Sequence, residues 1–169
     1  MKYISMSTYK HAWIFRHAEM TVPAEDLAEI KPMTATAAND LWRNNISKQG
    51  ENPDEFADND WPVTPSSWET TGEWQNSWES DAPTLPELLA ESLNWTPETT
   101  VYYCIDNETV FETRWEIFQK HWKNFLFFDD KTLLIGRKRK QAIQFHQDGT
   151  FQMGLKGTVP SANDSSVNG

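Results

Sequence analysis

An acidic, tryptophan-rich stretch is the part of this 169-residue sequence whose residue types point most directly to chemistry. Between Gln49 and Thr113 there is no lysine, arginine or histidine, although 15 of the 25 carboxylates and five of the nine tryptophans fall there. That stretch carries a formal charge of −15, and the rest of the chain carries +5. Carboxylates attract cationic groups, and indole rings stack on sugars or fill pockets of a protein partner. The stretch therefore predicts a non-covalent binding surface.

Residues 49–81 are its most unusual part, with nine carboxylates and four tryptophans. Prolines and small polar residues break any regular periodicity there, a composition that favours a loop or disorder. Indole rings usually find a packing partner, so we predict an ordered but irregular excursion that its tryptophans pin to the core. For most of these rings, packing is the main alternative to binding. The candidate binding residues are Trp61, Trp68, Trp74, Trp78, Asp58, Asp60, Glu69 and Glu73.

The overall charge limits the kind of partner. The net charge is −10 and the isoelectric point is near 4.8. Nucleic acids and anionic membranes are bound mainly through lysine and arginine, so neither is expected as a partner. A basic protein partner fits better, and the oligomeric state is left open.

Few residues have the spacing that a metal or cofactor site needs. His11 and His17 are six positions apart, and Cys104 is the only cysteine, within an apolar run that is typical of a buried strand. We therefore expect no metal and no cofactor. The N-terminus lacks the apolar core of a signal peptide, and no apolar run approaches the length of a membrane span, so we expect a cytoplasmic protein.

Arg16-His17-Ala18-Glu19 is the one motif that suggests a reaction. It resembles the N-terminal signature of histidine phosphatases, in which a strand ends in Arg-His-Gly/Ala-Glu. The resemblance implies that His17 is a nucleophile that accepts the phosphoryl group and that Arg16 clamps the phosphate. The alternative is a structural cluster of Arg16, His17 and Glu19 at the end of a strand.

Other parts of the sequence depart from the phosphatase pattern. The family has a second histidine followed by Gly or Asn, whereas His121 precedes Trp and His146 precedes Gln. It also has a second phosphate-binding arginine from a downstream helix, and no arginine lies between Arg43 and Arg114. These departures favour a protein without catalytic activity.

Local patterns predict an α+β fold with a single domain over residues 1–156 and a disordered tail over residues 157–169. We expect helices at 23–30, 36–47, 85–93 and 113–123, with Thr34, Thr84 and Thr113 as the caps of the last three. We expect strands at 2–6, 99–105, 125–128, 133–137, 141–146 and 151–153, and residues 12–16 also look extended, although they could open a helix. Those in the C-terminal half should form a mostly antiparallel meander, with helices packed on one face and the tryptophan-rich excursion outside it.

Motifs of the C-terminal half carry a resemblance to a known family. They are residues 101–104 (VYYC), Trp115, residues 122–127 (WKNFLF), Asp129-Asp130, residues 133–136 (LLIG) and residues 145–149 (FHQDG). Residues 13–17 (WIFRH), 30–32 (IKP) and 60–62 (DWP) carry the resemblance too, so it extends over nearly the whole chain except the tail. They resemble an uncharacterised family of short gammaproteobacterial proteins, a domain of unknown function, which implies no activity and no catalytic residues. The same pattern is similar, more loosely, to small α+β immunity proteins, which neutralise a basic toxin domain through an acidic face. The combined prediction is a non-enzymatic interaction protein that binds a basic partner, with phosphatase or hydrolase activity and carbohydrate binding as alternatives.

Overall fold

A run of β-branched and aromatic residues forms the centre of the sheet. This run is strand β3 (Thr100–Asp106), which pairs with β4 (Thr109–Arg114) on one side and β5 (Thr132–Gly136) on the other. The computed structural model describes residues 1–81 and 85–159, and the strand order of its seven-stranded sheet is β1-β4-β3-β5-β6-β7-β2. The other strands are β1 (Lys31–Pro32), β2 (Trp68–Glu73), β6 (Gln141–Phe145) and β7 (Thr150–Leu155). All pairs are antiparallel, which confirms the predicted α+β fold.

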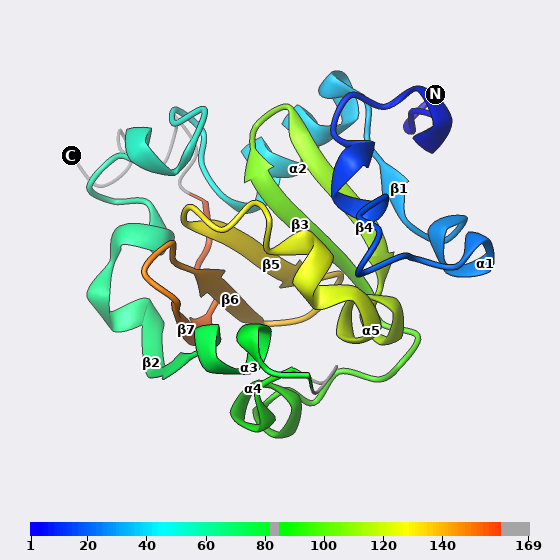
Figure 1. The fold of residues 1–169 in the computed structure, drawn as a ribbon. Helices are drawn as coiled ribbons and strands as arrows, with labels where there is room; N and C mark the ends of the chain where they lie inside the picture. Colours follow the sequence, from blue (N-terminus) through cyan, green and yellow to red (C-terminus); the bar gives the residue numbers. More distant parts are fainter. Residues whose placement is uncertain (82–84, 160–169) are drawn as a thin grey trace.

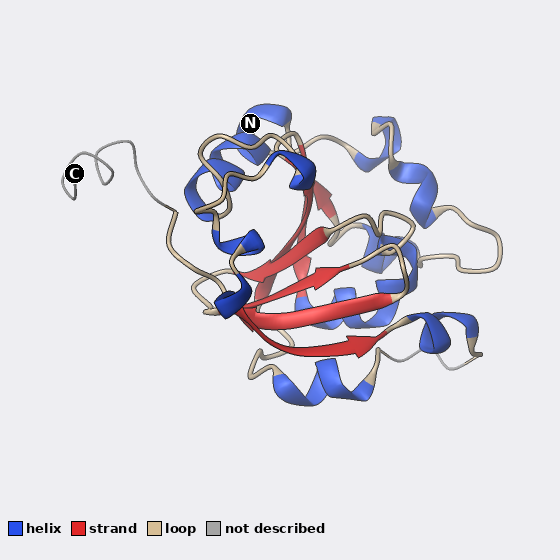
Figure 2. Ribbon diagram, turned by 90° about the vertical axis from the view of Figure 1, so that its left-hand side faces the viewer, coloured by secondary structure: helices blue, strands red, loops and turns tan. Residues whose placement is uncertain are grey.

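Helices cover both faces of this sheet. The α-helices are α1 (Ala24–Leu27), α2 (Ala35–Asn45), α3 (Gln75–Glu79), α4 (Glu87–Ser92) and α5 (Trp115–Phe125). The short 3-10 helices are η1 (Met6–Thr8), η2 (Ala12–Phe15), η3 (Pro53–Glu55), η4 (Trp61–Val63) and η5 (Pro65–Ser67). In Figure 1, α5 lies in front of the sheet and α2 lies behind it, and Figure 2 shows helices on both sides of the strands.

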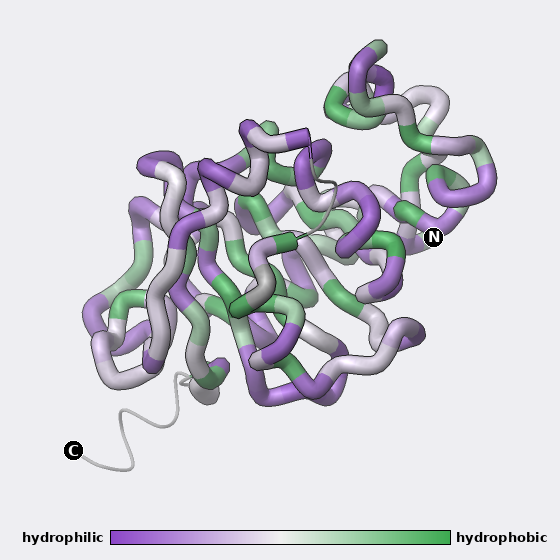
Figure 3. The backbone as a smooth tube through the Cα atoms, turned by 60° about the horizontal axis from the view of Figure 1, so that its bottom comes forward, coloured by the Kyte–Doolittle hydropathy of each residue, from purple (hydrophilic) through white to green (hydrophobic). Residues whose placement is uncertain are grey.

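Alternating side chains of β3 supply both layers of the core. Val101 and Tyr103 join a cluster with α5, α4 and η2, whereas Tyr102 and Cys104 join a second cluster with α2. The prediction that helices pack on one face is therefore wrong, because a strand whose two faces are both apolar needs cover on each. In Figure 3 the hydrophobic stretches lie mainly inside the molecule and the outer loops are mostly hydrophilic.

Several predicted elements are present. Helix α2 begins after Thr34, whose side chain accepts a hydrogen bond from the Ala37 backbone N–H at 3.3 Å, as a cap should. Strands β3, β5, β6 and β7 lie within a residue or two of their predicted ranges. Helix α1 is shorter than the predicted 23–30, and α4 begins at Glu87. The predicted cap Thr84 and residues 160–169 of the predicted tail lie outside the described residues, while 157–159 have no regular structure.

Other predictions are wrong. Residues 12–16 are not a strand: the helical alternative is right, because 12–15 form the helix η2, whose Ala12, Ile14 and Phe15 side chains enter the core. Residues 2–6 are not one either: Tyr3 makes one isolated bridge and Met6 begins η1. Residues 125–128 complete α5 and its turn, and Thr113 belongs to β4, so the cap of α5 is Arg114.

Candidate functional site

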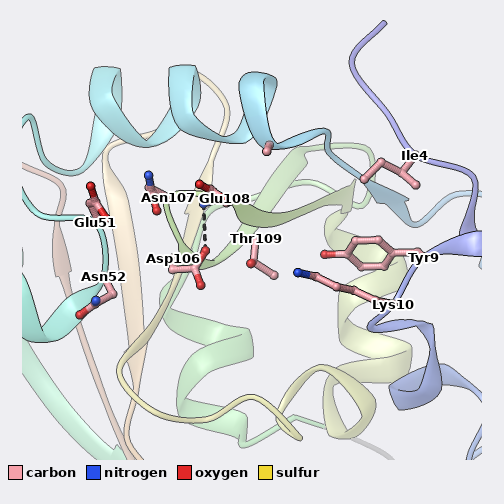
Figure 4. Close-up of a pocket in the computed structure, with 10 residues that line it drawn as sticks. Ile4, Tyr9, Lys10, Glu51, Asn52, Asp106, Asn107, Glu108 and Thr109 are labelled. Atoms are coloured by element: carbon pink, nitrogen blue, oxygen red, sulfur yellow. Dashed lines mark hydrogen bonds between the residues drawn. The ribbon is translucent and has the colours of Figure 1, made fainter.

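A polar cavity of about 350 Å³ lies beside the turn between β3 and β4. The N-terminal segment, the first residue of α2, the loop after α2 and the turn itself form its walls, as Figure 4 shows. The lining residues are Ile4, Tyr9, Lys10, Ala35, Glu51, Asn52, Asp106, Asn107, Glu108 and Thr109. Because these segments are far apart in the chain, the cavity exists only in the folded protein.

Hydrogen bonds fix the turn that forms the floor of this cavity. Asp106 Oδ1 accepts a hydrogen bond from the Glu108 backbone N–H at 2.8 Å, the local pattern that lets aspartate start a turn. The Asn107 backbone N–H donates to the Glu51 carbonyl oxygen at 2.8 Å, and its side-chain amide donates to Asn39 Oδ1 at 3.2 Å. The turn is therefore tied both to helix α2 and to the loop that follows it.

Two hydroxyl groups of the cavity lack a partner. Tyr9 and Thr109 are 8% and 6% exposed, and among the described residues no hydrogen bond reaches either hydroxyl. The Tyr9 ring is held edge-on against Phe111 and His11, with centroids 5.5 and 5.4 Å away. Burial, together with the nearby charge of Asp106, raises the pKa of Tyr9 to about 12. The phenol is therefore neutral at physiological pH and remains able to donate a hydrogen bond.

Charges of both signs surround these hydroxyls. The ammonium of Lys10 and the carboxylates of Glu51, Asp106 and Glu108 all line the cavity. Within residues 1–81 and 85–159, none of the four takes part in an ion pair. In Figure 4 the Lys10 ammonium and the Tyr9 hydroxyl point the same way, toward Thr109 and Asp106. The cavity can therefore offer a ligand a cation, carboxylates and two hydroxyls at once.

The four tryptophans proposed for binding all hold the 49–81 excursion in place. Trp61 and Trp74 are 3% and 6% exposed, and Trp68 and Trp78 are half-buried. Each indole N–H donates to a backbone carbonyl. In chain order the acceptors are Asn45, Pro62, His146 and Lys123, at 2.8, 2.9, 3.2 and 3.1 Å. The predicted pinning of an ordered excursion is confirmed, but the excursion is less irregular than predicted because it contains β2, α3 and three 3-10 helices.

The four acidic candidates divide into two groups. Asp58, Glu69 and Glu73 are exposed, and the last two share the solvent face of the edge strand β2. Asp60 is 4% exposed, and its Oδ2 accepts hydrogen bonds from the Ser47 hydroxyl and the Ala57 backbone N–H. The carboxylate of Asp60 therefore organises the loop, while the other three face water.

Arg16, His17 and Glu19 follow the helix η2, so the strand end that the phosphatase motif requires is absent at this point of the described chain. The His17 ring stacks on Phe127 with centroids 5.6 Å apart, and its Nδ1 accepts from the Glu19 backbone N–H at 3.3 Å. The Arg16 guanidinium reaches the Met6 carbonyl oxygen at 3.5 Å. The side chains of Arg16 and His17 therefore contact the N-terminal segment and Phe127, while Glu19 takes part through its backbone N–H.

A second cavity, of about 310 Å³, includes Glu19 and His121 in its lining. His121 Nε2 lies 2.8 Å from Asp26 Oδ2, and the two side chains are 12% and 13% exposed. Non-helical backbone angles at His121 mark a kink in α5. The pair joins α1 to α5 at this kink. Neither residue was selected from the sequence.

Sequence reasoning also missed the residues of the first cavity. Tyr9, Lys10, Asp106, Glu108 and Thr109 carry no motif, and only the charge bias of the 49–113 stretch includes two of them, Asp106 and Glu108. Among the described residues, no group of three or more histidine, cysteine, aspartate or glutamate side chains is placed to hold a metal ion. In that same part of the chain, no helix has the length and apolar character needed to cross a membrane.

The fold and the cavity together define a single-sheet α+β protein with a polar cavity at one hairpin turn. The chain belongs to the family described as "Protein of unknown function (DUF2947)", whose model matches residues 3–154. The comparison with curated proteins and the comparison with solved structures gave no match. The predicted resemblance to a family of unknown function is confirmed, while the gammaproteobacterial source and the likeness to immunity proteins stay predictions.

Proposed function

We propose that this chain is an interaction protein that binds a basic protein partner through its acidic side, the exposed carboxylates of residues 49–81. One observation carries the proposal: eight of the nine carboxylates of this segment are exposed, and no basic residue lies between Gln49 and Thr113. The eight are Glu51, Asp54, Glu55, Asp58, Glu69, Glu73, Glu79 and Asp81. Of these, only Asp54 forms an ion pair with a described residue, 2.7 Å from Lys131.

The tryptophan contacts support this proposal because they give the carboxylates a fixed scaffold. Figure 1 shows the segment running along one side of the molecule, where β2 forms the edge of the sheet. Opposite charges on fixed surfaces speed association and select against partners of the wrong charge. Glu69 and Glu73 also protect the exposed edge strand from pairing with other strands. The acidic side is therefore suited to a folded basic surface.

Trp13 offers an aromatic anchor for such a partner. It is 51% exposed, in contrast to the four tryptophans of the excursion. Its ring contacts Phe128, which contacts His11, which contacts Tyr9 of the first cavity, with successive centroids 6.0, 5.1 and 5.4 Å apart. Exposed tryptophans supply a large share of binding energy at protein interfaces. Trp13 is therefore a residue to include in any mapping of the interface.

A pull-down with the full chain tests the electrostatic basis of this proposal. Captured proteins are compared at about 50 mM and about 500 mM NaCl, since the higher ionic strength screens charges beyond a few ångströms. The triple variant Asp58→Asn, Glu69→Gln, Glu73→Gln should lose capture at the lower salt concentration. A matched variant, Glu25→Gln, Asp40→Asn, Asp130→Asn, removes three exposed carboxylates outside the segment and should retain it. Capture that is the same at both salt concentrations, or an equal loss of capture in both triple variants, would contradict the proposal.

The gene next to this one offers a second test. The likeness to immunity proteins suggests a basic toxin domain as the partner. Mixing that neighbour's product with this chain should then suppress its toxicity, and the triple variant should suppress it less. If the product of the neighbouring gene is acidic or does not bind this chain, an immunity role is contradicted.

A further inference from the structure

The cavity beside the β3–β4 turn is lined by two hydroxyls that have no hydrogen-bond partner in the described part of the protein. More than nine-tenths of Tyr9 and of Thr109 is buried, and among the described residues neither hydroxyl has a hydrogen-bond partner. Among the described residues, the buried side-chain polar atoms without a partner are Thr113 Oγ1 and Arg139 Nε, so the hydroxyls of Tyr9 and Thr109 are open to the cavity. Both groups belong to the cavity lining, and in Figure 4 the Tyr9 hydroxyl points toward Thr109. A polar ligand in the cavity would supply the missing partner.

The ionised groups around these hydroxyls have both signs but are not paired with each other. Lys10 on one wall and Glu51, Asp106 and Glu108 on the others all lie beyond the 4.0 Å limit for an ion pair. Opposite charges held apart across one cavity suit a ligand that carries both charges. Three carboxylates and one ammonium also leave the walls with an excess of negative charge, which favours a ligand with a net positive charge.

We propose that this cavity binds a free basic amino acid, with arginine as the best match. Its carboxylate pairs with the Lys10 ammonium and accepts a hydrogen bond from the Tyr9 hydroxyl. Its ammonium and guanidinium groups pair with Asp106 and Glu51, and the Thr109 hydroxyl accepts a hydrogen bond from the ammonium. The cavity volume of about 350 Å³ lies within the usual range for small-molecule sites.

A cationic side chain of a protein partner is the main competing occupant. Lys10 disfavours it, because its ammonium repels a ligand that has no carboxylate. The proposal is also separate from binding of a basic protein by the acidic side, since Asp58, Glu69 and Glu73 do not line the cavity. Experiments can therefore contradict amino-acid binding in the cavity without contradicting protein binding by the acidic side, and the reverse.

Isothermal titration calorimetry with the full chain tests the proposal. L-Arginine is compared with agmatine, which lacks the carboxylate, and with L-glutamate, which has the opposite net charge. Arginine should bind at least about tenfold more tightly than either compound. No heat of binding with arginine up to about 10 mM, or agmatine binding as tightly as arginine, overturns the proposal.

Variants of single groups assign the contacts. Lys10→Met should weaken the binding of arginine about tenfold and should not weaken the binding of agmatine, which the Lys10 ammonium repels. The control Lys2→Met, which removes an exposed lysine outside the cavity, should change neither. Tyr9→Phe keeps the ring contacts with Phe111. It should weaken the binding of arginine several-fold without lowering the unfolding temperature of the protein. Asp106→Asn should weaken the binding of both arginine and agmatine.

One outcome separates the two occupants directly. If Lys10→Met tightens the binding of both arginine and agmatine, the cavity takes a cation alone and the amino-acid proposal is overturned. The triple variant of the acidic side provides the reverse control. It should bind arginine as the unmodified chain does, even where it no longer captures a basic protein.

Discussion

Oδ2 of Asp60 lies 2.7 Å from the hydroxyl oxygen of Ser47, and the Asp60 side chain is almost fully buried. The same carboxylate oxygen accepts a hydrogen bond from the Ala57 backbone N–H at 2.9 Å. The Ser47 hydroxyl oxygen in turn accepts one from the Gly50 backbone N–H at 2.8 Å. One carboxylate therefore fixes the loop between α2 and η4, which brings Glu51 to the cavity and leaves Asp58 in water.

Replacing Asp60 should destabilise the protein, although it removes none of the exposed carboxylates of the acidic side. Asp60→Ala removes two hydrogen bonds to a buried carboxylate, and we expect a loss of about 2–4 kcal/mol in the free energy of unfolding. Asp58→Ala, at an exposed position in the same loop, should change it by less than about 0.5 kcal/mol. Urea denaturation followed by tryptophan fluorescence measures both values. Equal effects of the two changes would show that the Asp60 contacts do not hold the loop.

Trp61 should contribute to stability through its indole N–H as well as its buried ring. Trp61→Phe removes the donor that reaches the Asn45 carbonyl oxygen at 2.8 Å and reduces the contact with Trp68. We expect a loss of about 1–3 kcal/mol in the free energy of unfolding, since a partly buried carbonyl loses its partner. The control is Trp13→Phe, at the half-exposed tryptophan, which should cost less than about 0.5 kcal/mol. Thermal unfolding monitored by circular dichroism compares the two, and a larger effect at Trp13 would refute this ranking.

Gly154 should not tolerate a side chain. A Cβ placed there would lie 1.8 Å from the Ser67 carbonyl oxygen and 2.8 Å from the Trp68 Cα, and these backbone atoms can move only if β2 shifts. We expect Gly154→Ala to cost about 1–3 kcal/mol, with protease cleavage appearing first within the 49–81 excursion. Leu155→Ala, at the neighbouring exposed residue, should leave the excursion protected. Limited proteolysis with mass spectrometry locates the cleavage, and an unchanged pattern would contradict the proposed close contact.

Alkaline pH should destabilise the protein through buried tyrosines. Burial raises the pKa of Tyr103 well above its usual value, and the Tyr103 hydroxyl contacts the Phe128 carbonyl oxygen and Thr132 Oγ1. Burial also raises the pKa of Tyr9 to about 12. Because the unfolded chain releases these protons near pH 10 and the folded chain retains them, stability is fully present below about pH 10 and falls above it.

Denaturation at about pH 9 and about pH 11 measures this loss. Tyr103→Phe should lower the free energy of unfolding at both pH values but reduce the difference between the two. The reason is that the folded variant has one tyrosine proton fewer to retain at alkaline pH. A difference as large as in the unmodified chain would exclude Tyr103 as its source.

Strands β5, β6 and β7 could be located from the sequence because each pairs with its neighbour along the chain. Short turns connect them, so short apolar runs bounded by turn residues suffice to locate them. Strand β2 lacks this local signal. Its partner is β7, where Glu73 lies opposite Thr150, and its own residues are mostly polar. Strand β4 was missed because its end, Thr113, also fits a helix cap, and the pairing with β3 is what decided between the two.

The sequence by itself determined the fold class, the capped helix α2 and the separation of charge, since these depend on local patterns and composition. The tertiary structure decided what the individual residues do. It buried Asp60, Trp61 and Trp74, which composition alone could not distinguish from their exposed neighbours. It also brought Tyr9 and Lys10 beside Asp106 and Thr109. Those pairs meet only because β4 pairs with β3 and the N-terminal segment packs over their turn, so contacts between distant segments define the cavity.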